Sequence, residues 1–199
     1  MKDIFISRTY LPPLRKYNKY LKKIWKANWL TNNGELVQEL ERKLKKRLGV
    51  KHVVCVDHGT SALIISARAL GIKKKIYTSP YSFIASVSSM VWEGIKPIFV
   101  DLDEPFRGPA LVTHVYGTPQ LTNASPVIYD ASHAFAVKFG GKSILSYGDV
   151  SAISFNAVKL FQTAEARAIV TKNDEIAEKA RSMRNFGFRD RYSYQGTGI

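Results

Sequence analysis

The sequence has few of the features that define membrane and secreted proteins. Its 199 residues include a single cysteine, Cys55, so an internal disulfide is excluded and a reducing, cytoplasmic setting is expected. No apolar run approaches the roughly 18 residues that a membrane helix requires, and residues 1–8 contain no apolar core of a signal peptide. We therefore expect neither a membrane partner nor a disulfide-stabilised scaffold.

Patterns for metal binding and for common catalytic or nucleotide-binding loops are also missing. There is no G-x-G-x-x-G, no G-x-S-x-G and no Walker A loop. Residues 140–143, Gly-Gly-Lys-Ser, lack the upstream glycine of a P-loop and predict a hairpin turn instead. The histidines do not have zinc-site spacing, so we expect no metal: His52, His58, His114 and His133.

Acidic residues are scarce relative to basic ones. The chain has 30 lysines and arginines against 16 acidic residues, a net charge of +14, and the excess is concentrated in residues 15–26 and 42–47. Such a surface attracts polyanions, so nucleic acid, an anionic small molecule, or simply a solvated lysine-rich helix surface are the alternatives. The aromatic residues form no nucleic-acid-binding motif, and we do not expect a nucleic-acid partner.

Strand-like and helix-like segments alternate along the chain. Amphipathic or alanine-rich segments predict helices at 17–25, 36–48, 61–70, 83–92 and 173–183. This alternation predicts an α/β fold with a mostly parallel seven-stranded sheet and helices on both faces. Short apolar runs predict the seven strands at 53–56, 76–78, 97–100, 111–115, 127–129, 152–155 and 168–171.

Unusual residues follow three of the predicted strands, where open α/β sheets bind ligands. After the first strand, Gly59 permits close backbone approach, and Thr60 and Ser61 offer hydroxyls and free N–H groups at a helix start. That combination binds phosphate. The alternative is an ordinary Ser/Thr helix N-cap.

Asp130 follows an apolar strand, and a carboxylate in that place needs a cationic or hydrogen-bonding partner. A pyridinium nitrogen would serve, and a further helix N-cap is the alternative. Nearby His133 is either a ligand-binding residue or a histidine satisfied within the core.

Lys159 lies after another apolar run, five residues beyond Ser154. Desolvation there would favour a neutral, nucleophilic amine, which is the form that reacts with an aldehyde cofactor. An exposed lysine at a strand end is the alternative. Ser154 is a further candidate phosphate donor, and Phe83 is either a stacking partner for a flat ring or a core aromatic.

Taken in order, these segments resemble the pyridoxal 5′-phosphate (PLP)-dependent nucleotide-sugar aminotransferases of the DegT/DnrJ/EryC1/StrS family. The resemblance implies the large domain of the type I aminotransferase fold. It extends from about residue 11 to the end of the chain. The stretches that carry it include residues 29–34, 59–63, 80–83, 96–101, 114–117, 130–134, 154–159 and 184–187.

The resemblance implies a role for each candidate residue. Lys159 matches the lysine that binds PLP covalently and later moves a proton, and Asp130 matches the carboxylate that keeps the pyridine nitrogen protonated. Asn32 and Asn33 lie in a loop that is near the substrate in the family. The other matches are to the phosphate site (Gly59, Thr60, Ser61 and Ser154), the stacking aromatic (Phe83) and the residue beside the phenolic oxygen (His133).

The family further implies amino transfer from a donor, expected to be glutamate, to a nucleotide-linked keto sugar, carried out by a homodimer. Residues 1–199 would form a single PLP-binding large domain with an N-terminal helical segment over about residues 1–50, and the family's C-terminal small domain is absent. The alternative is a catalytically impaired or inactive compact homologue that serves as a binding or assembly module.

The main departure from the family pattern follows the candidate lysine. The family's Glu-Gly-Gly is Glu165-Ala166-Arg167 here. Two glycines permit a tight backbone course beside the site. The side chain of Arg167 needs room there, or supplies a cation that the family does not have.

Overall fold

The computed structural model describes residues 5, 7–188, 193 and 196–199. Its centre is a seven-stranded sheet with the order β1-β9-β8-β5-β4-β2-β3. Every strand is parallel to its neighbours except β9, which runs antiparallel to both β1 and β8. The mostly parallel seven-stranded sheet is therefore confirmed. Its strands are β1 (His52–Val56), β2 (Lys75–Thr78), β3 (Lys96–Phe99), β4 (Ala110–Thr113), β5 (Val127–Asp130), β8 (Val150–Ser154) and β9 (Arg167–Thr171).

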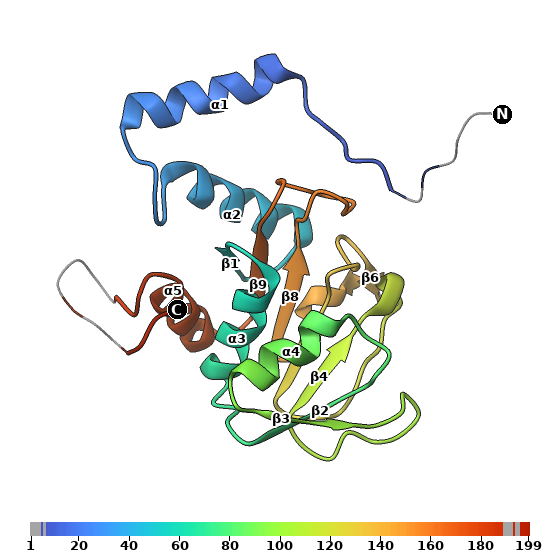
Figure 1. Cartoon of the computed structure of the whole chain (residues 1–199). Coiled ribbons are helices and arrows are strands. Elements are labelled where there is room, and N and C mark those ends of the chain that lie inside the picture. The colour runs from blue at the N-terminus through green and yellow to red at the C-terminus, as the bar shows by residue number, and fades with distance from the viewer. Residues whose placement is uncertain (1–4, 6, 189–192, 194–195) are drawn as a thin grey trace.

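Helices cover both faces of the sheet (Figure 1). On one face lie α3 (Gly59–Ala69), α4 (Ile84–Trp92) and α5 (Asp174–Arg184). On the other lie α2 (Glu35–Leu48) and the short 3₁₀ helix η2 (Ile144–Ser146). Helix α1 (Leu14–Ala27) has no buried residue and lies apart from the sheet, beyond α2 (Figure 1). Among the described residues, no helix is long and apolar enough to cross a bilayer.

Side chains that alternate in direction along each strand form hydrophobic cores on both faces of the sheet. In β1, Val54 and Val56 contact the side of α3 and α5, whereas Val53 and Cys55 contact the side of α2. Because successive side chains of a strand point to opposite faces, a continuous apolar run supplies both cores. Complete burial of a valine or isoleucine contributes roughly 1.5–3 kcal/mol. The continuous apolar runs therefore predict the buried central strands well.

Several predicted boundaries shift by one to three residues. The strand predicted at 111–115 ends at Thr113, because His114 begins the turn into the 3₁₀ helix η1 (Val115–Gly117), where Tyr116 has a φ of 52°. The third helix begins at Gly59 rather than at 61. The glycine pair at 140–141 does form a hairpin turn, between β6 (Lys138–Phe139) and β7 (Lys142–Ser143).

Candidate active site

The carboxyl ends of β4, β5 and β8 border a cavity of about 480 Å³. This volume is within the usual range for small-molecule sites, about 300–1,000 Å³. Four residues singled out in the sequence line it together, Phe83, Asp130, His133 and Lys159, and Arg167 lines it as well. They come from four separate segments, so only the strand order β9-β8-β5-β4-β2 brings them to one place.

Asp130, the last residue of β5, is buried and its carboxylate is held by two serines. Ser86 of α4 donates its hydroxyl to Oδ2 over 2.6 Å, and Ser132 donates its backbone N–H and its hydroxyl to Oδ1. A carboxylate has about four lone-pair positions, so the three donors leave room for one more. No helix follows Asp130, and the alternative of a helix N-cap is therefore wrong.

Lys159 lies in the loop after β8, where its backbone N–H donates to the carbonyl of Asn156 at 2.9 Å. The side chain is half-buried. Burial first, and then the positive charge of Arg167, lower the pKa of the Lys159 amine, while Asp130 acts in the opposite direction. Among the described residues its amine forms no ion pair. The environment thus favours the neutral amine more than water does.

Phe83 and His133 both line the cavity with aromatic rings. Phe83 precedes α4 at its N-cap position and is 65% exposed, so it is not a core aromatic. His133 is exposed and stacks on Tyr116, with ring centroids 5.9 Å apart, and its Nδ1 accepts the Tyr116 N–H at 3.2 Å. Partial burial and the charge of Lys159 lower the His133 pKa. The alternative of a core histidine is wrong for this residue.

The predicted phosphate residues lie beside this cavity and do not line it. Helix α3 has His58 as its N-cap, whose Nδ1 accepts the Ser61 N–H at 3.4 Å. An ordinary Ser/Thr cap is therefore wrong, and neither Thr60 nor Ser61 is the cap. Ser154 is buried, and its Oγ accepts the Asn156 N–H at 3.3 Å.

Arg167 lies between the cavity and the start of α3. It is the first residue of β9 and pairs in register with Val56 of β1 and Ser154 of β8. A Cβ atom at Gly59 would overlap the Arg167 guanidinium. The same side chain donates from Nη1 to the Ser132 hydroxyl at 2.6 Å. Arg167 therefore lies against Gly59 and is linked through Ser132 to Asp130.

Asn32 and Asn33 line a different hollow, of about 650 Å³, together with His58 and Ser61. The side chain of Asn33 is tethered, because its Oδ1 accepts from Nη2 of Arg184 at 3.2 Å. The structure does not bring the asparagines into the lysine cavity.

Sequence reasoning missed Ser86 and Ser132, the two serines that hold Asp130. Ser86 lies 44 residues from Asp130, in the first turn of an apolar helix. Serines are common in such helices, so no local signal distinguishes this one. Only the packing of α4 against the sheet shows that it faces Asp130.

His114 is a second residue that sequence reasoning left aside. It is completely buried, stacks on Tyr129 with centroids 4.6 Å apart, and accepts the Gln120 N–H on Nδ1 at 3.1 Å. Burial lowers its pKa from 6.5 to about 4, against a smaller opposite effect of Asp130. His114 therefore remains neutral in the folded chain at neutral pH.

This pKa predicts a loss of stability in mild acid. Between pH 6.5 and about 4 the unfolded chain binds a proton at His114 that the folded chain does not bind. Stability therefore falls as the pH falls through this window, by up to about 1.4 kcal/mol per pH unit. His114→Asn keeps an acceptor for Gln120 and should reduce that slope in urea unfolding experiments. Equal slopes for both proteins would contradict the assignment.

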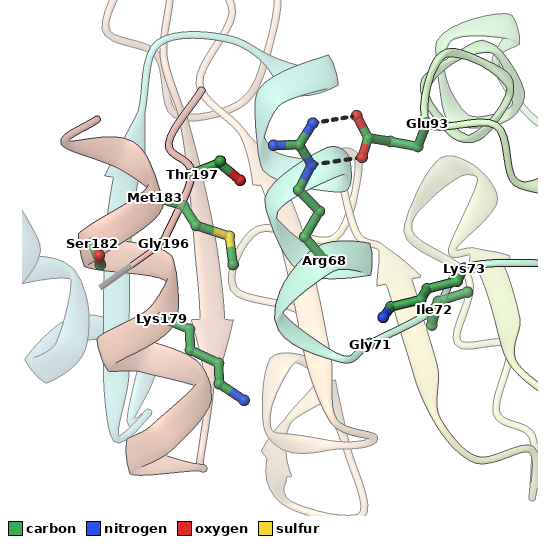
Figure 2. Close-up of a pocket in the computed structure, with 10 residues that line it drawn as sticks. All are labelled: Arg68, Gly71, Ile72, Lys73, Glu93, Lys179, Ser182, Met183, Gly196 and Thr197. Carbon is green, nitrogen blue, oxygen red and sulfur yellow. Dashed lines mark hydrogen bonds and ion pairs between the residues drawn. The ribbon is translucent and has the colours of Figure 1, made fainter. Parts of the chain in front are cut away.

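A further hollow, of about 380 Å³, lies near the C-terminal end of α3, between α3 and α5 (Figure 2). Arg68 and Glu93 form a two-bond ion pair at its edge, with N–O distances of 2.6 and 3.0 Å. The pair joins α3 to the end of α4. None of the candidate site residues lines this hollow, and its ion pair serves to connect two helices.

Known proteins with similar sequences are aminotransferases. The sequence profile of the DegT/DnrJ/EryC1/StrS aminotransferase family matches residues 15–107 and 122–199. The chain is 41% identical to a dTDP-4-amino-4,6-dideoxy-D-glucose transaminase of Shigella dysenteriae, over 95% of this chain and 58% of that protein. It is 34% identical to a protein of the same name from Escherichia coli, over 100% of this chain and 60% of that one.

The fold is shared with solved aminotransferase structures. The chain superimposes on the aminotransferase TlmJ of Streptoalloteichus hindustanus with a TM-score of 0.84 at 22% identity, covering 99% of this chain and 61% of TlmJ. The type I aminotransferase fold is thereby confirmed. The chain spans 58–60% of the length of the two curated relatives.

Proposed function

Because this chain belongs to the DegT/DnrJ/EryC1/StrS aminotransferase family, we propose that it acts as a PLP-dependent aminotransferase on a nucleotide-linked keto sugar, with glutamate as the amino donor. One observation carries the proposal. Lys159 and Asp130 line the same cavity from the ends of the neighbouring strands β8 and β5, with an exposed aromatic ring, Phe83, at its edge.

The residues present fit PLP. Asp130 keeps one acceptor position for the pyridine N–H, and its two serine partners fix its orientation. Phe83 would offer a ring face for stacking, and His133, which lines the same cavity, would serve as a donor to the phenolic oxygen. When bound, PLP supplies an electron sink for the carbon that loses its proton. The protein supplies orientation and charge.

Lys159 would have two tasks. Its Nζ would bind the cofactor covalently, and once released it would take a proton and return it. Both tasks require a neutral amine near physiological pH. Burial and the neighbouring charge of Arg167 lower the pKa of Lys159 in the direction that these tasks require.

The substrate class is supported by the two relatives, which are named as transaminases of a dTDP-linked amino sugar. A net charge of +14 also suits a substrate that carries a diphosphate. We assign Asn32 and Asn33 to the substrate side, because they line the hollow next to the α3 N-terminus together with Arg184.

The proposal includes the domain organisation and the assembly. One sheet with both faces covered supports a single large domain over residues 1–199, and the single buried Cys55 suits a reducing cytoplasm. A homodimer is supported by α1 and the segment before it, where large apolar side chains are exposed: Tyr10, Leu11, Leu14, Tyr17 and Trp25.

An inactive binding or assembly module is the second candidate. The position of Arg167 raises it, because the guanidinium lies over Gly59, where the sequence predicted close approach of a phosphate, and would have to either exclude that phosphate or bind it. PLP bound at Lys159 is compatible with both candidates, and the two differ in whether an amino group is then transferred.

A reconstitution experiment separates them. The chain is incubated with PLP, its visible absorbance is recorded, and glutamate is added while 2-oxoglutarate is measured. If the amino group of glutamate is transferred, a panel of dTDP-linked keto sugars is then tested as acceptors. We expect a protein-dependent band, its loss with glutamate, and a particle of twice the chain mass by light scattering. An absorbance band without formation of 2-oxoglutarate would favour the inactive module. Absence of the band would contradict the assignment of PLP to the Lys159 cavity.

A further inference from the structure

The strongest unexplained feature is the place of the Arg167 guanidinium. It lies over Gly59 at the first turn of α3 and lines the cavity that contains Lys159. Its Nη1 donates to Ser132, whose hydroxyl in turn donates to Asp130. This chain of hydrogen bonds gives the guanidinium a defined position. Its other N–H groups remain available on the side toward α3.

The local charges would repel one another without an anion. The N-terminus of a helix carries a positive partial charge, equivalent to roughly half an elementary charge. Arg167 adds a full positive charge there, and Lys159 lies close enough for its pKa to be lowered by Arg167. Among the described residues, Arg167 forms no ion pair with a carboxylate. An anion that contacts both the guanidinium and the first turn of α3 would remove this repulsion.

We propose that Arg167 binds the phosphate group of PLP, together with the first N–H groups of α3. This assignment rests on the proposed function, since it takes PLP as the ligand of the cavity. The planar guanidinium presents parallel N–H groups that match phosphate oxygens, and such charge-assisted bonds are stronger than neutral ones. The arginine that interrupts the family's glycine pair is thus a binding residue.

The proposal also gives Gly59 a specific role. A side chain at this position would overlap the guanidinium, so Gly59 leaves the space in which Arg167 lies. Gly59→Ala should displace the flexible end of Arg167 and weaken phosphate binding. In a protein that already carries Arg167→Met, the same change should have little further effect, because the two residues act on one interaction.

The test compares PLP with pyridoxal, which has the same ring and aldehyde but no phosphate. Dissociation constants are measured from the visible absorbance for the wild type, for Arg167→Met and for Arg47→Met, an exposed arginine at the end of α2. We expect Arg167→Met to weaken PLP binding by about 10- to 100-fold and to weaken pyridoxal binding far less, through the loss of the Arg167 charge beside Lys159 alone. Arg47→Met should change neither constant, and inorganic phosphate should compete with PLP in the wild type.

Two further results keep the assignment open to refutation. Arg167→Lys retains a charge and should recover part of the PLP affinity, while thermal unfolding shows whether each variant is folded. Tighter or equal PLP binding by Arg167→Met would overturn the assignment, as would an equal loss for pyridoxal. Either result leaves the proposed function standing. If the wild type shows no absorbance band that depends on Lys159, the proposed function fails and this assignment fails with it.

Discussion

Lys159→Ala is expected to abolish covalent binding of PLP and to lower amino transfer by at least about 10²- to 10⁴-fold, the usual contribution of a positioned proton-transfer group. Both losses have one cause, because the side chain supplies the only amine among the lining residues of the Asp130 cavity. The measurement is reduction with borohydride followed by mass spectrometry of peptides. In the wild type, the cofactor mass should be found on the peptide that contains Lys159.

A matched control uses another lysine. Lys142 is exposed in the hairpin strand β7 and lies outside the cavity, so Lys142→Ala should retain both the labelled peptide and the activity. Labelling that persists in Lys159→Ala, or that is found on a different lysine, would contradict the assignment. Lys159→Ala also removes a partly desolvated amine, so the fold itself should not be weakened by the change.

Asp130→Asn is expected to lower amino transfer by about 10²- to 10³-fold, the effect of removing one well-placed electrostatic partner. The substitution keeps the shape of the side chain and an acceptor for Ser86 or Ser132, but it removes the negative charge that would keep the pyridine nitrogen protonated. The absorbance band of bound PLP should shift or weaken. The rate of the half-reaction with glutamate should fall by a larger factor than the affinity for PLP.

A second carboxylate serves as the control. Asp101 is exposed after β3 and lies outside the cavity, so Asp101→Asn should leave the spectrum and the half-reaction unchanged. If Asp130→Asn reacts with glutamate as fast as the wild type, Asp130 is not the partner of the ring nitrogen. Asp130→Ala tests the structural role of this residue separately from its catalytic role. It leaves the buried hydroxyl of Ser86 without an acceptor, which should lower the free energy of unfolding by about 1–3 kcal/mol.

The sequence predicted the fold class and most elements because their signals are local. Continuous apolar runs mark strands that are buried on both faces, and the glycine after residues 36–48 marks a helix end, which the structure confirms at Gly49. The ends of elements were less certain. The strand predicted to reach 115 stops at Thr113, because the chain turns after His114 into the 3₁₀ helix η1, where Tyr116 has a positive φ.

The candidate site was predictable as a set of residues that follow strands, but its arrangement was not. The sequence indicated Asp130 and Lys159 because a carboxylate and an amine after apolar runs are unusual. It gave no indication that Ser86 would hold Asp130 from another helix. Nor did it show that Asn32 and Asn33 would line a separate hollow. Contacts of this kind depend on elements that are far apart in the chain.

Composition, apolar period and the residues after each strand were properties of the sequence alone, and they were enough to indicate an α/β fold with a ligand site at the strand ends. Only the tertiary structure determined which residues surround Arg167. Strand β9 runs antiparallel between β1 and β8, so its first residue lies at the ends of both neighbours, beside Gly59 and Ser132. Periodicity reports which face a residue occupies, whereas strand order, set by packing of the whole sheet, determines which charges meet.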